Sequence, residues 1–354
     1  MGDKKLPNLK GYVCLVTGAS RGIGRGIALA LGECGATVYI TGRTLKPKDD
    51  AKEGDAGGSL EETAAEITTR GGFALSCFSF FPRSLFPWSL TEQNGRLDLL
   101  VNNAFAAVSY LTSHSDMSYW ELEADDSTAK AWDVVNGVGL RNHYICATLA
   151  TRMMLEYRGE FTTESSDHEK KTSGNEKNSQ LSGNSQRPGL IINISSLGGL
   201  KYLFNVAYGV GKAAMDRMAA DMAHELHEKK KNIAIISLWP GMVRTEQFIK
   251  FAKKSEARTK ILEERGESPE LTGIVIAHLL VEPKEKLLSR SGRVPFVADT
   301  ALEMGIRDTN GKWPTSLRSL RYILEISGRT TLSRTVPEFV RVPYSAFNQL
   351  GTKF

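Results

Sequence analysis

The strongest candidate for chemistry in the chain is a tyrosine that lies one helical turn before a lysine. Apolar periodicity predicts a helix over residues 207–228, so the side chains of Tyr208 and Lys212 share one face. A phenol with its ordinary pKa of about 10 exchanges protons poorly at neutral pH. A fixed ammonium beside it favours the phenolate and lowers that pKa toward the working range. The pair therefore predicts an acid–base centre, although the pattern by itself is common on helix surfaces.

Two serines could serve the same centre. Ser195 and Ser196 stand at the end of an apolar run, residues 189–195, which predicts a buried strand. A serine hydroxyl in that place could donate a hydrogen bond to the oxygen of a substrate carbonyl group. Because serine at a strand end is also an ordinary turn residue, this signal gains weight only together with the others.

A glycine-rich turn predicts a site for a phosphate-bearing cofactor. It follows an apolar run over residues 12–17 and precedes a predicted helix. Glycines let the backbone approach a ligand closely, and a helix N-terminus offers N–H groups and positive potential to a pyrophosphate. The residues that we expect to contact the cofactor here are Gly18, Ser20, Arg21, Gly22, Ile23 and Gly24. A turn that only packs a helix on a strand is the alternative interpretation.

Charge beyond the second strand favours NADP(H) over NAD(H). Sites that prefer NAD usually place Asp or Glu about 20 residues after the glycines. Here the strand expected over residues 36–41 is followed by Gly42 and Arg43, and no carboxylate occurs before Asp49. Arg43 and Arg21 could together bind a 2′-phosphate. Two solvated surface arginines are the alternative.

Alternating strands and helices position these residues. Apolar runs predict further strands over 97–103, 233–238 and 293–297, and a long helix over 132–154. Ser59 and Glu62 have the spacing of a capping box, and Gly71-Gly72 would end the helix that it starts. This alternation predicts an α/β fold, a single doubly wound Rossmann-type domain with a mostly parallel sheet.

Composition excludes several classes of protein. The 354 residues are 41% hydrophobic and 24% charged, which is typical of a globular chain. Four scattered cysteines predict neither a disulfide framework nor a metal site, and they favour an intracellular location. A net charge of +5 suits an anionic cofactor and gives little support to a nucleic-acid partner. We expect no secretory signal, because residues 1–10 are charged and contain no apolar run. We expect no membrane-spanning helix, because no apolar run reaches about 18 residues.

Five short segments occur in an order that resembles the short-chain dehydrogenase/reductase family. They are Thr17–Gly24, Asn102-Asn103-Ala104, Ser195-Ser196, Tyr208-x-x-x-Lys212 and Pro240-Gly-Met-Val-Arg-Thr245. The resemblance covers roughly residues 8–300, which we take as the Rossmann-type domain. Within it, residues 159–187 are polar and low in apolar content, so we expect a disordered inserted loop there.

The resemblance implies a role for each residue of the centre. Tyr208 would be the general acid in reduction and the base in oxidation. Lys212 would lower the pKa of that phenol and hold the nicotinamide ribose. The usual family spacing points to Ser195 as the residue that orients the substrate oxygen, whereas the local pattern Ser-Ser-x-x-Gly points to Ser196, which we prefer.

It also implies which residues surround the cofactor, whose nicotinamide ring delivers the hydride. Besides the glycine-rich turn and Arg43, these are Asn103, Ala104, Tyr208, Lys212, Pro240, Gly241 and Thr245.

Two departures from the family pattern fall near the predicted centre. The family usually has an asparagine in the long central helix that supports a proton relay, but the alignment puts Gly139 in that position. Asn136 lies about one turn earlier, and we expect it to be exposed or to cap a helix rather than to substitute. Phe105 follows Asn-Asn-Ala where the family usually has glycine, so we expect a narrower or reshaped pocket.

A third departure is the segment Phe73–Leu90. It has one charge and two prolines, and it lacks the aspartate that usually ends the third strand and contacts adenine. The segment therefore looks unlike a strand followed by a helix. Either cofactor binding is weakened by a genuine change, or the segment reflects an error in the gene model.

The C-terminal extension, residues 301–354, lies beyond the part that resembles the family. Leu317, Leu320, Ile323 and Leu324 recur at helical spacing. A helix on a membrane surface is one interpretation, and packing on the chain's own fold or on a sister subunit is the one that we prefer. The resemblance further suggests a homo-oligomer in the cytoplasm or at the endoplasmic reticulum.

These observations predict an NADPH-dependent carbonyl reductase or alcohol dehydrogenase. The apolar residues that we expect near the pocket, Phe105, Tyr202, Phe204, Trp239 and Met242, suggest a bulky hydrophobic carbonyl substrate, steroid-like or xenobiotic. The alternative is a catalytically impaired NADP-binding scaffold protein.

Overall fold

The core of the protein is one parallel sheet. The computed structural model describes residues 5–47, 57–78, 93–122, 127, 129–160 and 187–351. Its six strands lie in the order β3-β2-β1-β4-β5-β6, with every neighbouring pair parallel. They are β1 (Val13–Thr17), β2 (Thr37–Gly42), β3 (Phe73–Phe78), β4 (Leu99–Asn102), β5 (Gly189–Ile194) and β6 (Ile233–Leu238). The predicted fold class is confirmed.

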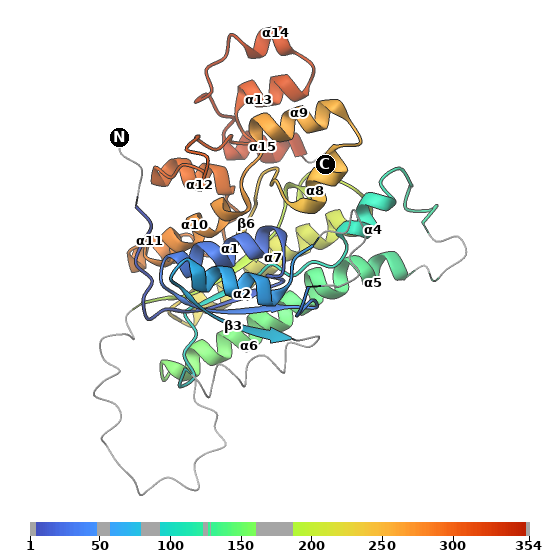
Figure 1. The fold of residues 1–354 in the computed structure, drawn as a ribbon. Coiled ribbons are helices and arrows are strands. Elements are labelled where there is room, and N and C mark those ends of the chain that lie inside the picture. Colours follow the sequence, from blue (N-terminus) through green and yellow to red (C-terminus); the bar gives the residue numbers. More distant parts are fainter. Residues whose placement is uncertain are drawn as a thin grey trace, which may run out of the picture.

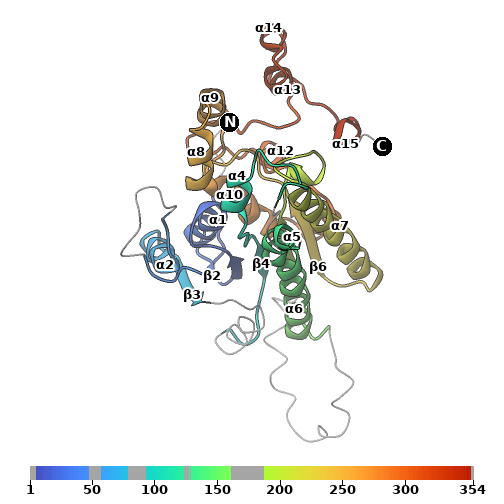
Figure 2. The same cartoon turned by 90° about the vertical axis from the view of Figure 1, so that its right-hand side faces the viewer.

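Helices cover both faces of the sheet, which is why its central strands are apolar without alternation. Figure 2 shows α1 (Gly22–Glu33), α2 (Leu60–Thr69) and α10 (Pro269–Leu280) on one side of the strands. On the other side lie α5 (Lys130–Asn136), α6 (Asn142–Tyr157) and α7 (Val206–Glu228). Two separate apolar clusters fill the space between the sheet and these two layers.

Shorter helices occupy the connections and the C-terminal part. They are α4 (Val108–Ser113), α8 (Glu246–Ala252), α9 (Glu256–Arg265), α11 (Lys284–Ser289), α12 (Val297–Met304), α13 (Leu320–Ile326), α14 (Thr330–Ser333) and α15 (Tyr344–Gly351). A single 3₁₀ turn, Leu197–Gly199, follows β5. Figure 1 shows most of these helices, namely α8, α9 and α12 to α15, above α1 and α10.

The structure corrects three predicted elements. The long helix expected over 132–154 is α5 and α6 joined by a π-helical turn, Gly137–Arg141. The final strand expected over 293–297 is only an isolated bridge between Trp239 and Phe296, because α12 begins at Val297. The doubted segment after residue 72 does begin with a regular strand, since β3 pairs with β2 along its whole length.

Two predictions concern residues that the structure does not describe. Residues 79–90, the rest of the doubted segment, lie outside the described part of the chain, and so does most of the insertion expected over 159–187. Within the described ranges, none of the helices combines the length and the apolar character needed to cross a membrane.

The C-terminal extension packs on the chain's own fold. Phe347 of α15 joins Trp239 and Phe296 in a buried aromatic cluster, with Leu317 and Ile323 packed against it. An ion pair between the Asp299 carboxylate of α12 and the Arg318 guanidinium, at 2.7 Å, stabilises the same region. This arrangement agrees with the preferred interpretation of the apolar spacing in the extension.

Candidate active site

The predicted acid–base pair lies at the start of α7. Asn205 caps this helix by accepting a hydrogen bond from the backbone N–H of Tyr208 at 2.9 Å. Tyr208 and Lys212 are both buried, with 8% and 7% of their surface exposed. The Tyr208 ring lies against Gly198 so closely that a side chain at that position would clash with it. The first turns of α7 are thus held against the loop that follows β5.

The two candidate serines have different partners. Ser196 accepts from the backbone N–H of Gly198 at 3.0 Å, and its hydroxyl is hydrogen-bonded to the Tyr208 side chain. Ser195 donates to the Lys212 carbonyl oxygen at 3.3 Å and is hydrogen-bonded to Asp216. The geometry therefore favours Ser196 as the serine that shares a substrate oxygen with Tyr208, while Ser195 holds the helix.

The electrostatics of Tyr208 differ from the sequence-based expectation. Burial raises the pKa of the phenol above its usual 10.0, the hydrogen bond with Ser196 lowers it, and the charge of Asp216 raises it. Lys212 does not reverse this direction, because its ammonium donates to the Ile194 carbonyl oxygen at 3.0 Å and lies 5.9 Å from the centre of the Tyr208 ring. In this arrangement Tyr208 is a protonated donor at neutral pH.

Lys212 itself is strongly affected by burial. Removal of its ammonium from water lowers the pKa to about 8, and the charge of Asp216 acts in the opposite direction. The ammonium also lies 5.1 Å from the centre of the Phe105 ring, within the range of a cation–π contact. Lys212 is therefore held between the β5 carbonyl group and an aromatic ring.

Asp216 is a partly buried residue of this site that the sequence analysis missed. It accepts from Ser237, and from the indole N–H of Trp239 at 3.1 Å, so it joins α7 to the end of β6. Burial raises the pKa of its carboxyl group, and these hydrogen bonds together with that to Ser195 lower it. Its position one turn after Lys212 on the same face was the available signal in the sequence.

Phe105 occupies space that Gly139 leaves open. A Cβ atom on Gly139 would lie 2.7 Å from Cδ2 and 2.9 Å from Cε2 of the Phe105 ring. The ring meets Tyr208 edge to face, with the ring centres 5.8 Å apart. Because Gly139 belongs to the π-helical turn, the two departures noted in the sequence are parts of one packing arrangement.

Asn136 is neither exposed nor a side-chain cap, so that expectation was wrong. It is 5% exposed, and its side chain donates to the Ala207 carbonyl oxygen at 3.2 Å. Its amide oxygen lies so close to the backbone of Gly211 that a side chain there would clash with it. Asn136 therefore contacts the turn of α7 that carries Tyr208 and Lys212.

His143 is a second buried group that the sequence analysis missed. Its Nε2–H donates to the Ala104 carbonyl oxygen at 2.9 Å, which fixes the segment after β4. Burial and, to a smaller extent, the charge of Lys212 lower the pKa of its imidazole to about 3, although the hydrogen bond to Ala104 acts in the opposite direction. His143 is therefore neutral across the physiological range. A histidine close to a lysine in space, but far from it in sequence, gives no local signal.

The glycine-rich turn is locked by the Asn-Asn-Ala segment. Gly18 has a φ of 71°, and a Cβ atom there would lie 2.7 Å from Cα of Ala104. The Asn103 side chain donates to the carbonyl oxygens of Thr17 at 2.9 Å and Gly18 at 3.1 Å. Asn103 and Ala104 thus hold the turn against β4, and Gly24 contacts the same Asn103 side chain.

The first turn of α1 can receive an anion. Arg21 precedes the helix in an extended conformation and its side chain does not cap it. The N–H of Gly22 donates to the Glu246 carboxylate at 3.2 Å, and Thr245 lies next to Gly22. A carboxylate thus already accepts from the helix end that we predicted to bind a pyrophosphate, which shows that these donors suit a negatively charged group. Glu246 was not predicted.

The loop after β6 is supported by a buried carboxyl group. Glu267 accepts from the backbone N–H of Gly241 at 3.0 Å. Burial raises the pKa of Glu267 to about 8, the hydrogen bond from Gly241 lowers it, and Asp308 raises it. Because Pro240 and Gly241 are predicted cofactor neighbours, Glu267 positions that part of the site. No sequence motif pointed to it.

The two arginines predicted to select NADP(H) lie at the ends of neighbouring strands. Arg43 is exposed immediately after β2. Arg21 donates to the side chain of Thr44, the residue next to Arg43, at 3.2 Å. Ser20 lies in the turn before Arg21 and is buried, and Ile23 lies in the first turn of α1 and is partly buried. A guanidinium group can bind a phosphate group through paired hydrogen bonds.

A row of aromatic rings begins at Tyr208. Phe204 meets Tyr208 edge to face, with the ring centres 5.2 Å apart. Phe251 of α8 lies 6.3 Å beyond Phe204, and Phe248 continues the row at 5.9 Å. Phe248 and Phe251 were missed because the sequence around them is dominated by charge.

The other predicted apolar neighbours lie elsewhere. Trp239 is 7% exposed and belongs to the buried aromatic cluster beneath the extension. Tyr202 is 73% exposed, and Met242 contacts the hydroxyl group of Tyr322 in the extension. Of the five residues proposed from the sequence, Phe105 and Phe204 contact the Tyr208 ring.

Comparison with known proteins gives a consistent result. A family model described as short chain dehydrogenase matches residues 179–256. Dehydrogenase/reductase SDR family member 1 of Mus musculus is 38% identical over 359 residues, which cover 98% of this chain and 99% of the relative. The protein of the same name from Homo sapiens is 38% identical over 95% of each chain.

Solved structures share the fold. A short-chain dehydrogenase/reductase from Serratia marcescens superposes with a TM-score of 0.56 at 21% identity, over 81% of this chain and 96% of that one. At this identity the likeness supports the arrangement of strands and helices alone.

Proposed function

Because the chain belongs to the short-chain dehydrogenase/reductase family, and so is an NAD(P)-dependent oxidoreductase, we propose that it reduces bulky hydrophobic carbonyl compounds with NADPH. Steroid-like molecules and xenobiotics are the substrate classes we have in mind. The observation that carries the proposal is the buried contact between Ser196 and Tyr208 beside Lys212.

The donors present fit a dinucleotide phosphate. The N–H of Gly22 at the first turn of α1 would donate to the pyrophosphate in place of the Glu246 carboxylate. Arg43 and Arg21 would bind the 2′-phosphate, and the lack of Asp or Glu in the sequence from Arg43 to Lys48 supports NADP(H) over NAD(H). When bound, the nicotinamide supplies the hydride.

The proton would come from Tyr208. A hydroxyl that is protonated at neutral pH, as the raised pKa of Tyr208 implies, suits the reductive direction. Ser196 and Tyr208 would both donate to the carbonyl oxygen and stabilise the negative charge that develops on it. Lys212, held by the Ile194 carbonyl group, would bind the ribose and keep a positive charge close to the phenol.

The shape of the surroundings supports an apolar substrate. Phe204, Phe248 and Phe251 form a row of rings that begins at Tyr208. Such rings offer large apolar area at a low cost in side-chain entropy. A bulky carbonyl compound could therefore lie along them with its oxygen at Tyr208.

Nucleotide titration tests the cofactor part of the proposal. NADPH fluorescence is followed with wild type, Arg43→Ala and Arg152→Ala, the last being an exposed arginine on α6 that serves as a matched loss of charge. We expect Arg43→Ala to weaken NADPH binding roughly ten- to a hundredfold and to leave NADH binding unchanged, since charged hydrogen bonds are lost. Arg152→Ala should match wild type. Binding of neither nucleotide by folded protein would refute the proposal.

A carbonyl screen tests the chemical part. Consumption of NADPH with aromatic ketones, steroid ketones and short aldehydes is compared in wild type and Tyr208→Phe. We expect turnover of the bulky compounds and its loss in the variant, with NADPH affinity kept. Turnover that survives in Tyr208→Phe would contradict the assigned acid.

A further inference from the structure

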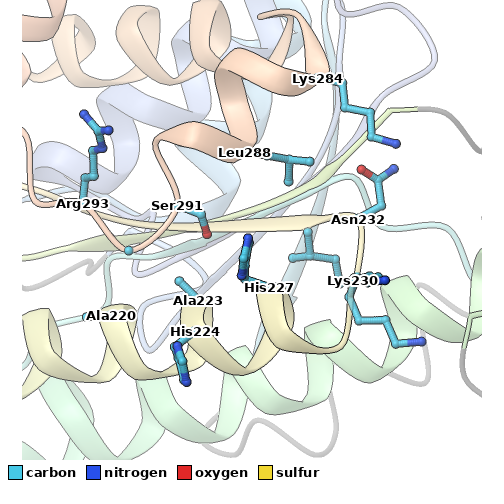
Figure 3. Close-up of a pocket in the computed structure, with 13 residues that line it drawn as sticks. Ala220, Ala223, His224, His227, Lys230, Asn232, Lys284, Leu288, Ser291 and Arg293 are labelled. Carbon is cyan, nitrogen blue, oxygen red and sulfur yellow. The ribbon is translucent and has the colours of Figure 1, made fainter.

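A basic groove lies at the end of β6 remote from the active site. It has a volume of about 580 Å³ and is lined by the last two turns of α7, the start of β6 and the segment from α11 to Arg293. Figure 3 shows His227 pointing from α7 toward Ser291 and Leu288, with Lys284 and Asn232 near one end of the groove. Since Tyr208 and Ser196 lie at the opposite end of the sheet, the groove is separate from the proposed catalytic centre.

The charge of the groove has one sign. Lys230, Lys231, Lys284 and Arg293 line it together with two histidines, and no lining residue is Asp or Glu. Lys231 donates to the Glu160 carbonyl oxygen at 2.7 Å. The other three cations have no ion-pair partner among the residues that the structure describes. Their charge is therefore available to an anionic ligand.

The basic residues in and just after α11 differ in their partners. On one face Lys286 and Arg290 both pair with Glu282, at 2.8 Å each. Lys284 and Leu288 line the groove instead. Carboxylates thus neutralise two cations in and just after α11, whereas Lys284 pairs with no carboxylate among the described residues.

Lys230 stands at a backbone position that disfavours its side chain. Its φ is 52°, in the left-handed region that glycine usually occupies after a helix. Lys230 and Lys231 donate their backbone N–H groups to the last carbonyl groups of α7, on His227 and Leu226. These carbonyl groups are thus satisfied without the ammonium groups, and glycine would serve the helix end better.

We propose that the groove binds a phosphate-bearing ligand with an apolar portion. Lys230 and Lys284 lie at the same end of the groove, with Arg293 at the other end (Figure 3), and neither lysine has an ion-pair partner among the described residues. Two such cations suit a dianionic phosphate better than a single carboxylate. Ala220, Ala223 and Leu288 line the groove and offer apolar surface to the rest of the ligand. The volume lies in the range of small-molecule sites, which favours a compact ligand over an extended nucleic acid. A soluble phosphomonoester and a lipid headgroup present the same chemistry.

Direct binding of n-octyl phosphate to the full chain tests the proposal, with inorganic phosphate and uncharged n-octyl glucoside as comparison probes in calorimetry. We expect n-octyl phosphate to bind most tightly, with affinity falling at high salt. Lys230→Gln and Lys284→Gln should each weaken it roughly tenfold, because a charged hydrogen bond is lost. Lys229→Gln is the matched control, since Lys229 is exposed, adjacent in sequence and not part of the lining.

Lys230→Gly gives a second, independent test. Because glycine suits the left-handed position, this variant should raise the thermal midpoint while it weakens n-octyl phosphate binding. Sedimentation with phosphatidylcholine vesicles, with and without phosphatidic acid, distinguishes a lipid headgroup from a soluble ligand. NADPH affinity should be unchanged in every variant. A failure of n-octyl phosphate to bind would therefore not count against the proposed reductase function.

Two results would overturn the proposal. One is binding of n-octyl phosphate no tighter than that of n-octyl glucoside. The other is an equal loss of affinity in Lys229→Gln, which would indicate attraction to net charge and not to the groove.

Discussion

A methyl group added at residue 139 should disturb the active site through Phe105. The Cβ atom of Gly139→Ala would lie 2.7 Å and 2.9 Å from two carbon atoms of the Phe105 ring. That ring has little freedom to move, because it contacts Tyr208 edge to face and lies 5.1 Å from the Lys212 ammonium. We therefore expect the substitution to shift the ring and, with it, the acid–base pair.

The size of the effect follows from two opposing contributions. Overpacking a tight core costs about 1–3 kcal/mol of the free energy of unfolding. Alanine in place of glycine in a helix raises the free energy of unfolding by up to about 1 kcal/mol. Gly137 lies in the same π-helical turn and has open space at its Cβ position. Gly137→Ala should therefore show the higher helix propensity of alanine without a steric clash. Gly139→Ala should be less stable than Gly137→Ala by about 1–3 kcal/mol.

A double-mutant cycle isolates the contact. Urea unfolding gives the free energy for Gly139→Ala, Phe105→Leu and the double variant, and NADPH fluorescence gives the affinity of each. In the Phe105→Leu background the added methyl group has room, so Gly139→Ala should become neutral or stabilising. We expect a coupling energy of at least about 1 kcal/mol, as for residues in direct contact. NADPH affinity should fall in Gly139→Ala and stay at the wild-type value in Gly137→Ala.

Additive effects would refute this reasoning. If the double variant equals the sum of the single ones within about 0.5 kcal/mol, the ring and residue 139 are not coupled. Equal loss of stability in Gly137→Ala would instead locate the cost in the π-helical turn itself.

Three further predictions concern charge in the site. Glu246→Gln should tighten NADPH binding several-fold in fluorescence titration, because it removes the carboxylate at the N–H of Gly22; unchanged or weaker binding would contradict this. The pKa of Lys212 in the folded protein, about 8, lies below its usual 10.5, so the folded protein releases this proton at a lower pH than the unfolded chain does. The free energy of unfolding should therefore rise by about 3 kcal/mol from pH 8 to 10.5. Urea unfolding should detect that rise without nucleotide and find it absent in Lys212→Met. Asp216→Ala should lower the free energy of unfolding by about 1–3 kcal/mol, because it leaves the indole N–H of Trp239 without its acceptor. A change below about 0.5 kcal/mol in urea unfolding would contradict that role.

Local patterns in the sequence sufficed for the main architecture. Continuous apolar runs identified β1, β4, β5 and β6, because strands covered on both faces have no polar side to alternate. The glycine-rich turn and the pair Tyr208 and Lys212 were also visible, since a turn and a helical face depend on neighbours within a few residues. The edge strand β3 was doubted because its composition resembles neither pattern.

Contacts between distant segments were decided only by tertiary structure. The sequence left Ser195 and Ser196 as alternatives, and their partners Asp216 and Tyr208 on α7 distinguish them. The proximity of Glu246 to Gly22 likewise joins residues 224 positions apart. Sequence periodicity carries no information on such pairs.

The π-helical turn shows the same limit within one helix. Apolar spacing predicted an uninterrupted helix over 132–154, and the turn Gly137–Arg141 changes which residues face α7. Asn136 is buried against Gly211 as a result, and Gly139 accommodates Phe105. The physical reason is that a side chain's neighbours depend on the packing of whole elements, whereas local sequence specifies only the elements themselves.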